Sequence, residues 1–197
     1  MALLNFDEVA RFAARPLTEG LVKSAAETSP QETNVFLSYS SKDREHVAGV
    51  LRFFEQFDAT VYVDIEDTAL PEVPSVVTAA TLCEKIEQAR RLVVLVTKTT
   101  QTSLWVPWEL GVAHGKKGVS PVALLPLSPA DEDQDEMWTK QHYLGLYPRI
   151  RFGPLHHRRS NATSAEWMVH DPRDKRSWPI LQWLHEEIAE EPEVPMK

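Results

Sequence analysis

Two short segments of the sequence carry side chains that could together do chemistry on a ligand. The first runs through Ser38-Tyr39-Ser40 directly after an apolar stretch, and the second places Trp105 four residues before Glu109. A carboxylate beside an aromatic wall suits cleavage of a glycosidic bond, because the departing base leaves an oxocarbenium-like sugar that the carboxylate can stabilise. Glu109 is therefore the candidate catalytic residue, and Trp105 is a candidate stacking surface for a nicotinamide or adenine ring.

Several of these side chains also have a structural explanation. A lone glutamate in the first turn of a helix, where we place Glu109, complements the positive end of the helix dipole. Tryptophan is usually a core residue, and we assign that role to Trp108 while giving the ligand contact to Trp105. Asp43 is interpreted first as a helix cap or first-turn acid, and only secondarily as a site residue.

The Ser38-Tyr39-Ser40 segment leaves similar alternatives open. Tyr39 could pack at the end of a strand, or its hydroxyl could contact a ligand ring or ribose. Ser38 and Ser40 could hydrogen-bond to a ligand, although serine is equally common as a helix cap.

Hydrophobic patterning predicts strands that alternate with helices along most of the chain. The runs expected to form strands are 34–39, 60–65, 92–96, 122–127 and 147–152. Helical spacing covers 43–57, 78–90, the segment with Pro107 in its first turn, and 177–187. The side chains expected to face inward on these helices are Val47, Val50, Leu51, Phe54, Leu82, Ile86, Ala89, Ile180, Leu181, Leu184 and Ile188.

This alternation predicts the fold class α/β, a flavodoxin-like doubly wound parallel five-stranded sheet with strand order 2-1-3-4-5. We expect the main domain over 34–190, after an N-terminal helical extension and linker over 1–33 that breaks at Pro16, and before a C-terminal tail over 191–197. In this order the first and third strands are neighbours, and ligands bind beyond the carboxyl ends of such strands. The topology therefore brings Ser38-Tyr39-Ser40 close to the segment that follows Thr97 and leads to Glu109.

Several familiar uses of such a sheet edge are excluded by missing motifs. No Gly-x-Gly-x-x-Gly follows the first strand and no Walker A motif is present, so the usual phosphate cradles are absent. The third strand ends in Thr97 and Lys98 rather than in the carboxylate of a phosphoacceptor. The seven histidines form no zinc-type pair, and the acidic stretch 131–136 is interpreted as a solvated loop, so no metal site is proposed.

Charge and composition exclude further classes. A net charge of −8 argues against a nucleic-acid face, and the short basic cluster 156–159 is interpreted as a solvated loop. The single cysteine, Cys83, cannot form an internal disulfide and is expected to be a buried, inert thiol. No apolar run approaches the roughly 20 residues that span a bilayer, and no signal-peptide pattern opens the chain. We expect a soluble, cytoplasmic protein with no membrane partner.

Three motifs in this order resemble a TIR (Toll/interleukin-1 receptor) domain over residues 34–187. Phe36-Leu37-Ser38-Tyr39-Ser40 with Lys42-Asp43 is similar to the opening strand of the family. Tyr62-Val63-Asp64 and the loop from 66 to 74 resemble its second strand and BB loop, although this loop has two prolines and no glycine. Residues 103–110 are similar to the Trp-x-x-x-Glu pattern of NAD-cleaving members, in which the glutamate is catalytic.

The resemblance implies a site in which Glu109 is catalytic. Its substrate-binding residues would be Ser38, Tyr39, Ser40, Asp64 and Trp105. It also implies NAD as the substrate, with no prosthetic group.

A TIR domain without a receptor segment is similar to stand-alone bacterial TIR proteins of anti-phage defence, such as the TIR subunit of Thoeris. That similarity implies release of nicotinamide and a cyclised ADP-ribose signal for a separate downstream effector, together with self-association through TIR surfaces. One alternative is a non-catalytic TIR scaffold that binds other TIR domains, and another is nucleotide binding or transfer at a different nucleoside bond. The stretches 128–146 and 153–176 fit the family pattern poorly and could cover the site or recruit a partner.

Overall fold

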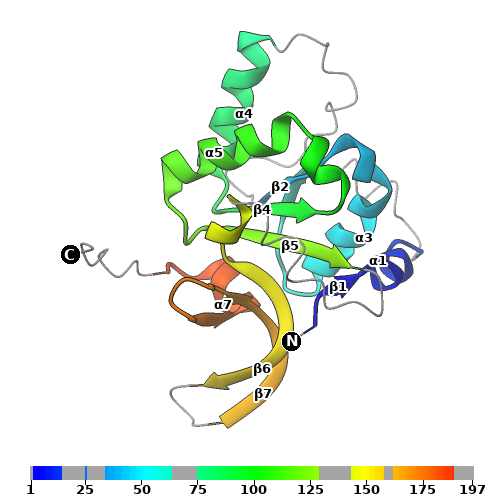
Figure 1. Cartoon of the computed structure of the whole chain (residues 1–197), viewed down its shortest axis with the longest axis vertical. Coiled ribbons are helices and arrows are strands. Elements are labelled where there is room, and N and C mark those ends of the chain that lie inside the picture. The colour runs from blue at the N-terminus through cyan, green and yellow to red at the C-terminus, as the bar shows by residue number, and fades with distance from the viewer. Residues whose placement is uncertain are drawn as a thin grey trace, which may run out of the picture.

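The computed structural model of this chain describes residues 2–14, 25, 34–63, 75–128, 143–157 and 162–188. Its strands are β1 (Leu4–Asn5), β2 (Val35–Ser38), β3 (Val61–Val63), β4 (Arg91–Val96), β5 (Val122–Ser128), β6 (Arg149–His157), β7 (Ala162–His170) and β8 (Ser177–Pro179). They form one sheet in the order β3-β2-β4-β5-β6-β7-β8, with β1 joined to β5 (Figure 1). The first five strands of this order are parallel, which confirms the predicted 2-1-3-4-5 arrangement.

Two hydrophobic layers cover the faces of this sheet because successive side chains of a strand point to opposite sides. On β4, Leu92, Val94 and Val96 pack in the same core as helices α4 (Val76–Gln88) and α5 (Trp105–Lys117). Val93 and Leu95 pack in the other core, with helices α3 (Arg44–Glu55) and α7 (Ile180–His185). The first is called here the α5-side core and the second the α3-side core.

Most of the side chains that were predicted to face inward on the helices are buried. The expected inward side chains that are buried are Val47, Val50, Leu51, Phe54, Leu82, Ile86, Ala89, Ile180 and Leu184. Cys83 is only half-buried, so its predicted burial is wrong: it lies about a third of a turn away from the inward row formed by Leu82 and Ile86. None of the described helices is long and apolar enough to cross a membrane.

The last part of the sheet was not predicted. β6 continues past its expected end and pairs in antiparallel register with β7, which then pairs with β8. β8 occupies the first residues of the segment predicted as helix, so α7 begins only at Ile180. Ile180, Trp183 and Leu184 form the inward row at helical spacing and are buried, whereas Leu181 is half exposed, so its predicted inward position is wrong.

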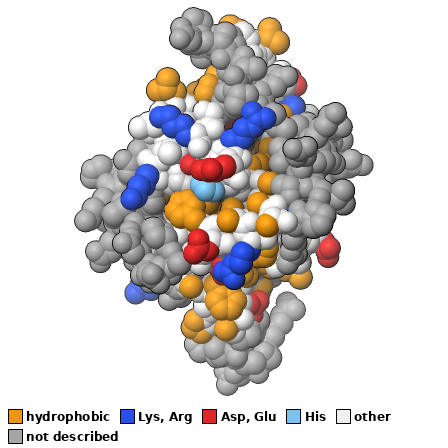
Figure 2. Space-filling model, turned by 90° about the vertical axis from the view of Figure 1, so that its right-hand side faces the viewer, with side chains coloured by type: hydrophobic (Ala, Val, Ile, Leu, Met, Phe, Trp, Pro, Cys, Tyr) orange, Lys and Arg blue, Asp and Glu red, His pale blue; other side chains and the backbone are white. Residues whose placement is uncertain are grey.

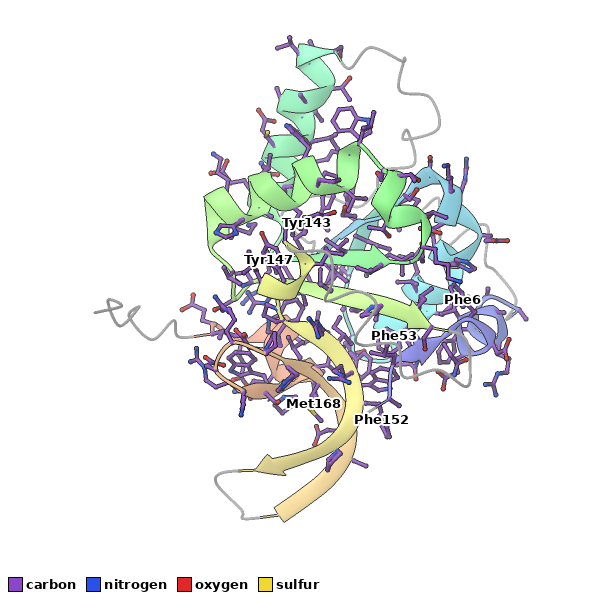
Figure 3. All side chains as sticks on the ribbon, viewed as in Figure 1. Phe6, Phe53, Tyr143, Tyr147, Phe152 and Met168 are labelled. Atoms are coloured by element: carbon purple, nitrogen blue, oxygen red, sulfur yellow. The ribbon has the colours of Figure 1, made fainter. Side chains whose placement is uncertain are left out.

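Polar contacts connect α7 to β4 and the turn before β6 to α5. Arg91, at the start of β4, donates hydrogen bonds to the carbonyls of Trp183 and Glu186, both 2.5 Å away, at the carboxyl end of α7. Burial lowers the pKa of Arg91 to about 10, which still leaves it charged at neutral pH. On the other side, Tyr147 lies beneath α5, just after the 3₁₀ turn η5 (Leu144–Leu146), and its hydroxyl is 2.8 Å from Nδ1 of His114 (Figure 3).

The N-terminal segment enters the sheet instead of lying outside it. Leu4 pairs with Leu127 of β5, and the backbone of Ala2 exchanges two hydrogen bonds with Phe152 of β6. The predicted helix is present as α1 (Phe6–Ala13), where Asn5 and Glu8 form a reciprocal capping box. The predicted break at Pro16 lies outside the described residues.

On the face shown in Figure 2, acidic and basic side chains of the described residues are interspersed around a histidine.

Helix α1 packs closely on α3 at a glycine. A Cβ atom on Gly49 would lie 2.1 Å from the carbonyl oxygen of Val9 and 2.6 Å from a Val9 methyl group. The absence of a side chain at Gly49 therefore sets the distance between the two helices.

Gly49→Ala should lower the free energy of unfolding by about 1–3 kcal/mol, because α1 must move away to admit the methyl group. Gly115→Ala on α5 is the matched control, since a Cβ there meets nothing within 4 Å. That control should stabilise by about 0.5–1 kcal/mol through helix propensity alone. Urea unfolding of both variants measures the difference, and a neutral Gly49→Ala would show that the contact is not tight in solution.

The turn between β7 and β8 is organised by a buried carboxylate. Asp171 is 0% exposed and accepts hydrogen bonds from the backbone N–H of Arg173 at 2.9 Å and from its guanidinium at 2.6–3.2 Å. Burial acts to raise the pKa of Asp171, but the hydrogen bonds and charge of Arg173, with the charge of Arg176, hold it below its ordinary value. The ionised form is therefore the one that the fold favours.

Asp171→Asn should destabilise the protein by about 1.5–3 kcal/mol at pH 7, where the charged hydrogen bonds are intact. Because the folded pKa lies below the unfolded one, this contribution is fully present above about pH 4 and is lost as the pH falls through the folded pKa. The gap between wild type and variant should therefore narrow on acidification, as measured by urea unfolding across pH. Asp174→Asn in the same turn is the control, because its pair with Arg176 is more exposed and should contribute less than about 1 kcal/mol.

Candidate functional site

The predicted meeting of the two sequence segments occurs through one buried hydrogen bond. Ser38 is the last residue of β2, and its hydroxyl donates to Oε2 of Glu109 on α5. Ser38 is 1% exposed and Glu109 is 6% exposed. Phe36, two residues earlier, packs in the α5-side core, so the pleat of β2 directs Ser38 to the same side. The strand end and the helix therefore present a hydroxyl and a carboxylate to each other.

Glu109 lies deeper in its helix than predicted. Helix α5 begins at Trp105, where the hydroxyl of Ser103 accepts the N–H of Val106 at 3.3 Å, so Glu109 is the fifth helical residue. Pro107 is in the first turn as expected, but the prediction that Glu109 also lies there is wrong. The helix dipole acts mainly within the first turn, so it does not explain this carboxylate. Burying a carboxylate is costly without polar partners, and the Ser38 hydroxyl supplies one.

The two tryptophans before Glu109 form a single aromatic unit. Their ring centroids are 5.3 Å apart with the planes at 89°, an edge-to-face contact. Both Trp105 and Trp108 are half-buried against the α5-side core, so the structure does not divide them into a core residue and a ligand residue. Trp105 precedes Glu109 by four residues and therefore lies on the same side of α5. The residue before it, Leu104, is 90% exposed.

A second buried carboxylate connects the two neighbouring strand ends. Asp43 is 3% exposed, and its Oδ2 accepts hydrogen bonds from the hydroxyls of Thr97 at 2.7 Å and Thr99 at 2.6 Å. Asp43 occupies the N-cap position of α3, as interpreted from the sequence, but its side chain makes no capping hydrogen bond to that helix. Thr100 closes the turn after β4 by accepting the N–H of Thr97 and donating to the carbonyl of Leu95. Sequence reasoning missed this contact, although three threonines directly after an apolar strand were a signal for it.

The remaining predicted site residues have different surroundings. Tyr39 is buried in the α3-side core, so the structure does not bring its ring to Glu109. Ser40 is buried, and its carbonyl accepts the N–H of Asp43 at 2.7 Å. Asp64 lies outside the described residues, as do the loop 66–74 and the acidic stretch 131–136. Of the predicted set, the structure thus joins Ser38 to Glu109 directly and places Trp105 on the same helix.

Among the side chains that the structure describes, no group of three His, Cys, Asp or Glu is arranged to hold a metal ion. The described polar side chains that meet here are hydroxyls and carboxylates. Such a set can orient an alcohol or a sugar and can stabilise positive charge.

Comparison with known proteins shows the family to which this chain belongs. A sequence model described as the TIR domain matches residues 35–149, which run from β2 to the start of β6. The chain belongs to the TIR domain family. It is also 33% identical over 155 residues to a protein of Bacillus cereus (strain MSX-D12) named probable 3' cyclic ADP-D-ribose synthase ThsB'. That alignment covers 78% of this chain and 76% of the relative.

Within this TIR domain, the matched range contains the whole candidate site. Ser38, Asp43, the three threonines after β4 and Glu109 all lie between residues 35 and 149. The segments β7, β8 and α7 lie beyond the matched residues.

Proposed function

We propose that this TIR protein cleaves the bond between nicotinamide and ribose in NAD, with Glu109 as the catalytic residue. The observation that carries the proposal is the buried carboxylate of Glu109, held by the Ser38 hydroxyl at the carboxyl end of β2. In an open parallel sheet, this is the edge where ligands bind. The name of the relative supports the proposal, because a cyclic ADP-ribose is what NAD yields when it loses nicotinamide and closes on itself.

The chemistry asks little of the protein beyond charge and placement. In NAD the nicotinamide is a pyridinium cation, so it leaves as a neutral molecule and needs no proton from a general acid. The C1′ atom of the ribose then carries the positive charge of an oxocarbenium ion. The carboxylate of Glu109 stabilises this charge, and Ser38 keeps the carboxylate in one orientation before the reaction begins. Trp105 offers its indole as the stacking surface, with no prosthetic group required.

The fate of the cation decides the product, and we propose a cyclised ADP-ribose. A nucleophilic atom elsewhere in the same ADP-ribose attacks C1′, forms the new bond and releases any proton it carries to solvent. Proximity favours this internal attack, because the nucleophile is already bound. A water nucleophile would be helped by a second carboxylate that acts as a base. The other buried carboxylate at this edge is Asp43, and one of its oxygens already accepts two threonine hydroxyls, so that oxygen is not available to take a proton from water.

The cellular role is taken from the resemblance to stand-alone bacterial TIR proteins and is part of the proposal. The product would act as a signal in anti-phage defence of the Thoeris type, sensed by a separate effector, and the TIR protein would self-associate through its TIR surfaces. We place this activity in the cytoplasm, where NAD is available. The proposed substrate-binding set keeps Ser38, Ser40 and Trp105, together with Tyr39 and Asp64 from the family pattern.

A non-catalytic TIR scaffold is the second candidate. The observation that favours it is exposed apolar surface: Leu104 is 90% exposed, and Val76 and Val77 at the start of α4 are 86% and 75% exposed. Such side chains suit contact with another TIR domain. Nicotinamide release by the purified protein distinguishes the two candidates, since a scaffold has no turnover.

Glu109→Gln should reduce nicotinamide release from NAD by about 100- to 1000-fold, because it removes the charge that stabilises the transition state while keeping the shape of the side chain. Glu45→Gln is the control: Glu45 is exposed on α3, and its loss should leave turnover unchanged. Both variants should keep the circular dichroism spectrum of the wild type. The assay is run over a range of protein concentrations, because the proposal includes self-association. Wild-type turnover in folded Glu109→Gln protein would remove Glu109 from the mechanism.

The product formed at early times should be mainly cyclised ADP-ribose, because the internal nucleophile is closer than any activated water. Chromatography with mass detection separates the two products, since the linear form is heavier by one water molecule. Predominantly linear ADP-ribose at early times would reject cyclisation and leave a glycohydrolase that depletes NAD.

A further inference from the structure

The carboxyl ends of β2 and β4 are held together by side chains where the backbone ladder stops. The last paired residues of the two strands are Ser38 and Val94. Beyond them the chain continues as the 3₁₀ turn η2 (Ser41–Asp43) on the β2 side and as η4 (Thr99–Thr102) on the β4 side. Side-chain hydrogen bonds connect these two turns, which flank the candidate site.

We propose that Asp43 is the positioning residue that sets the distance between these two turns and thereby places Trp105 for NAD. The proposal rests on the function proposed above. Asp43 contacts no reacting atom in this scheme; it acts through the hydroxyls of Thr97 and Thr99.

The geometry at Asp43 suits a rigid link. One carboxylate oxygen accepts two hydroxyls at 2.7 and 2.6 Å, and the group is almost fully buried. Hydrogen bonds to an ionised acceptor are about twice as strong as neutral ones, and burial strengthens them further. The nearby contact from Lys42 to Thr102 spans the same turns, but it is exposed and 3.3 Å long, so it adds less.

From the two threonines, the link continues to the start of α5. The N–H of Thr99 donates to the Thr97 hydroxyl at 3.1 Å, and the N–H of Ser103 donates to the carbonyl of Thr100 at 3.2 Å. The hydroxyl of Ser103 in turn accepts the N–H of Val106, next to Trp105. A movement of η4 away from η2 would therefore shift the first turn of α5.

Glu109 is held by a different contact. Its carboxylate meets the Ser38 hydroxyl within the part of the sheet where β2 and β4 are still paired. The two links consequently have separate effects: Asp43 controls where the aromatic surface lies, and Ser38 controls the orientation of the catalytic carboxylate.

The kinetic test compares Asp43→Ala with Ser38→Ala. Asp43→Ala should raise KM for NAD about 10- to 100-fold and change kcat less, because it moves a binding surface. Ser38→Ala should instead lower kcat more than it raises KM, because it loosens a group that acts in the transition state. Asp43→Asn should recover most of the loss, since its amide oxygen can accept the same two hydroxyls. Glu45→Gln, two residues away and exposed, is the charge-matched control.

A general loss of stability would lower the amount of active protein. It would not separate the effect on KM from the effect on kcat, and Asp43→Asn would not reverse it. Thr99→Val and Thr99→Ser sharpen the test, because only serine keeps the hydroxyl. Thr99→Val should raise KM, Thr99→Ser should not, and Asp43→Ala combined with Thr99→Val should be no worse than Asp43→Ala alone. The positioning role would be overturned if Asp43→Ala lowered kcat as much as Ser38→Ala does. It would also be overturned if the losses of Asp43→Ala and Thr99→Val added up in the double variant.

Hydrogen exchange tests the same link without enzyme activity. In Asp43→Ala the amides of Thr97, Thr99 and Ser103 should exchange at least tenfold faster, while those of β5 keep their wild-type rates. Unchanged exchange at these amides would overturn the proposal whatever the kinetics show. A wild-type protein that releases no nicotinamide would reject the proposed function, and the exchange rates would then decide the role of Asp43 alone.

Discussion

The parallel pairing of β2 with β4 is the constraint on which the candidate site depends. It aligns Val35 with Arg91 and Ser38 with Val94, so the two strands end at the same edge. Parallel strands cannot be joined by a tight turn, and each must be followed by a crossover of its own. The residues after both strands are therefore brought side by side, although more than fifty positions separate Asp43 from Thr97 in the chain.

Two buried carboxylates at this edge show how the fold accommodates a polar site inside an apolar sheet. Desolvation acts against each charge, and each is offset by hydroxyl donors: Ser38 for Glu109, and Thr97 with Thr99 for Asp43. From Leu92 to Val96, β4 is apolar on both faces, as a central parallel strand requires. Polar groups thus concentrate where the strands end, and the chemistry is built on a rigid support.

The segments outside the matched TIR range extend the same sheet. β7 and β8 add an antiparallel edge, α7 covers the α3-side core, and β1 inserts against the end of β5. Arg91 links the end of α7 to the start of β4. Thr97 follows the other end of that strand. Of these segments, β1 pairs at the carboxyl end of β5, at Leu127 and Ser128, whereas Arg91 acts at the amino end of β4.

The sequence by itself determined the order of the five parallel strands and most of the inward helix positions, and it predicted that Ser38 and Glu109 come from segments that lie close together. These features depend on local periodicity and residue type, which a single chain displays directly. It did not determine that Glu109 lies in the second turn of α5, because the first helical residue depends on the hydroxyl of Ser103 and on the chain before it. Nor did it indicate β1 and β8, which are two or three residues long and exist only because a partner strand is present. The tertiary structure alone decided which hydroxyl meets which carboxylate, since such contacts join distant residues and follow from register and pleat rather than from sequence spacing.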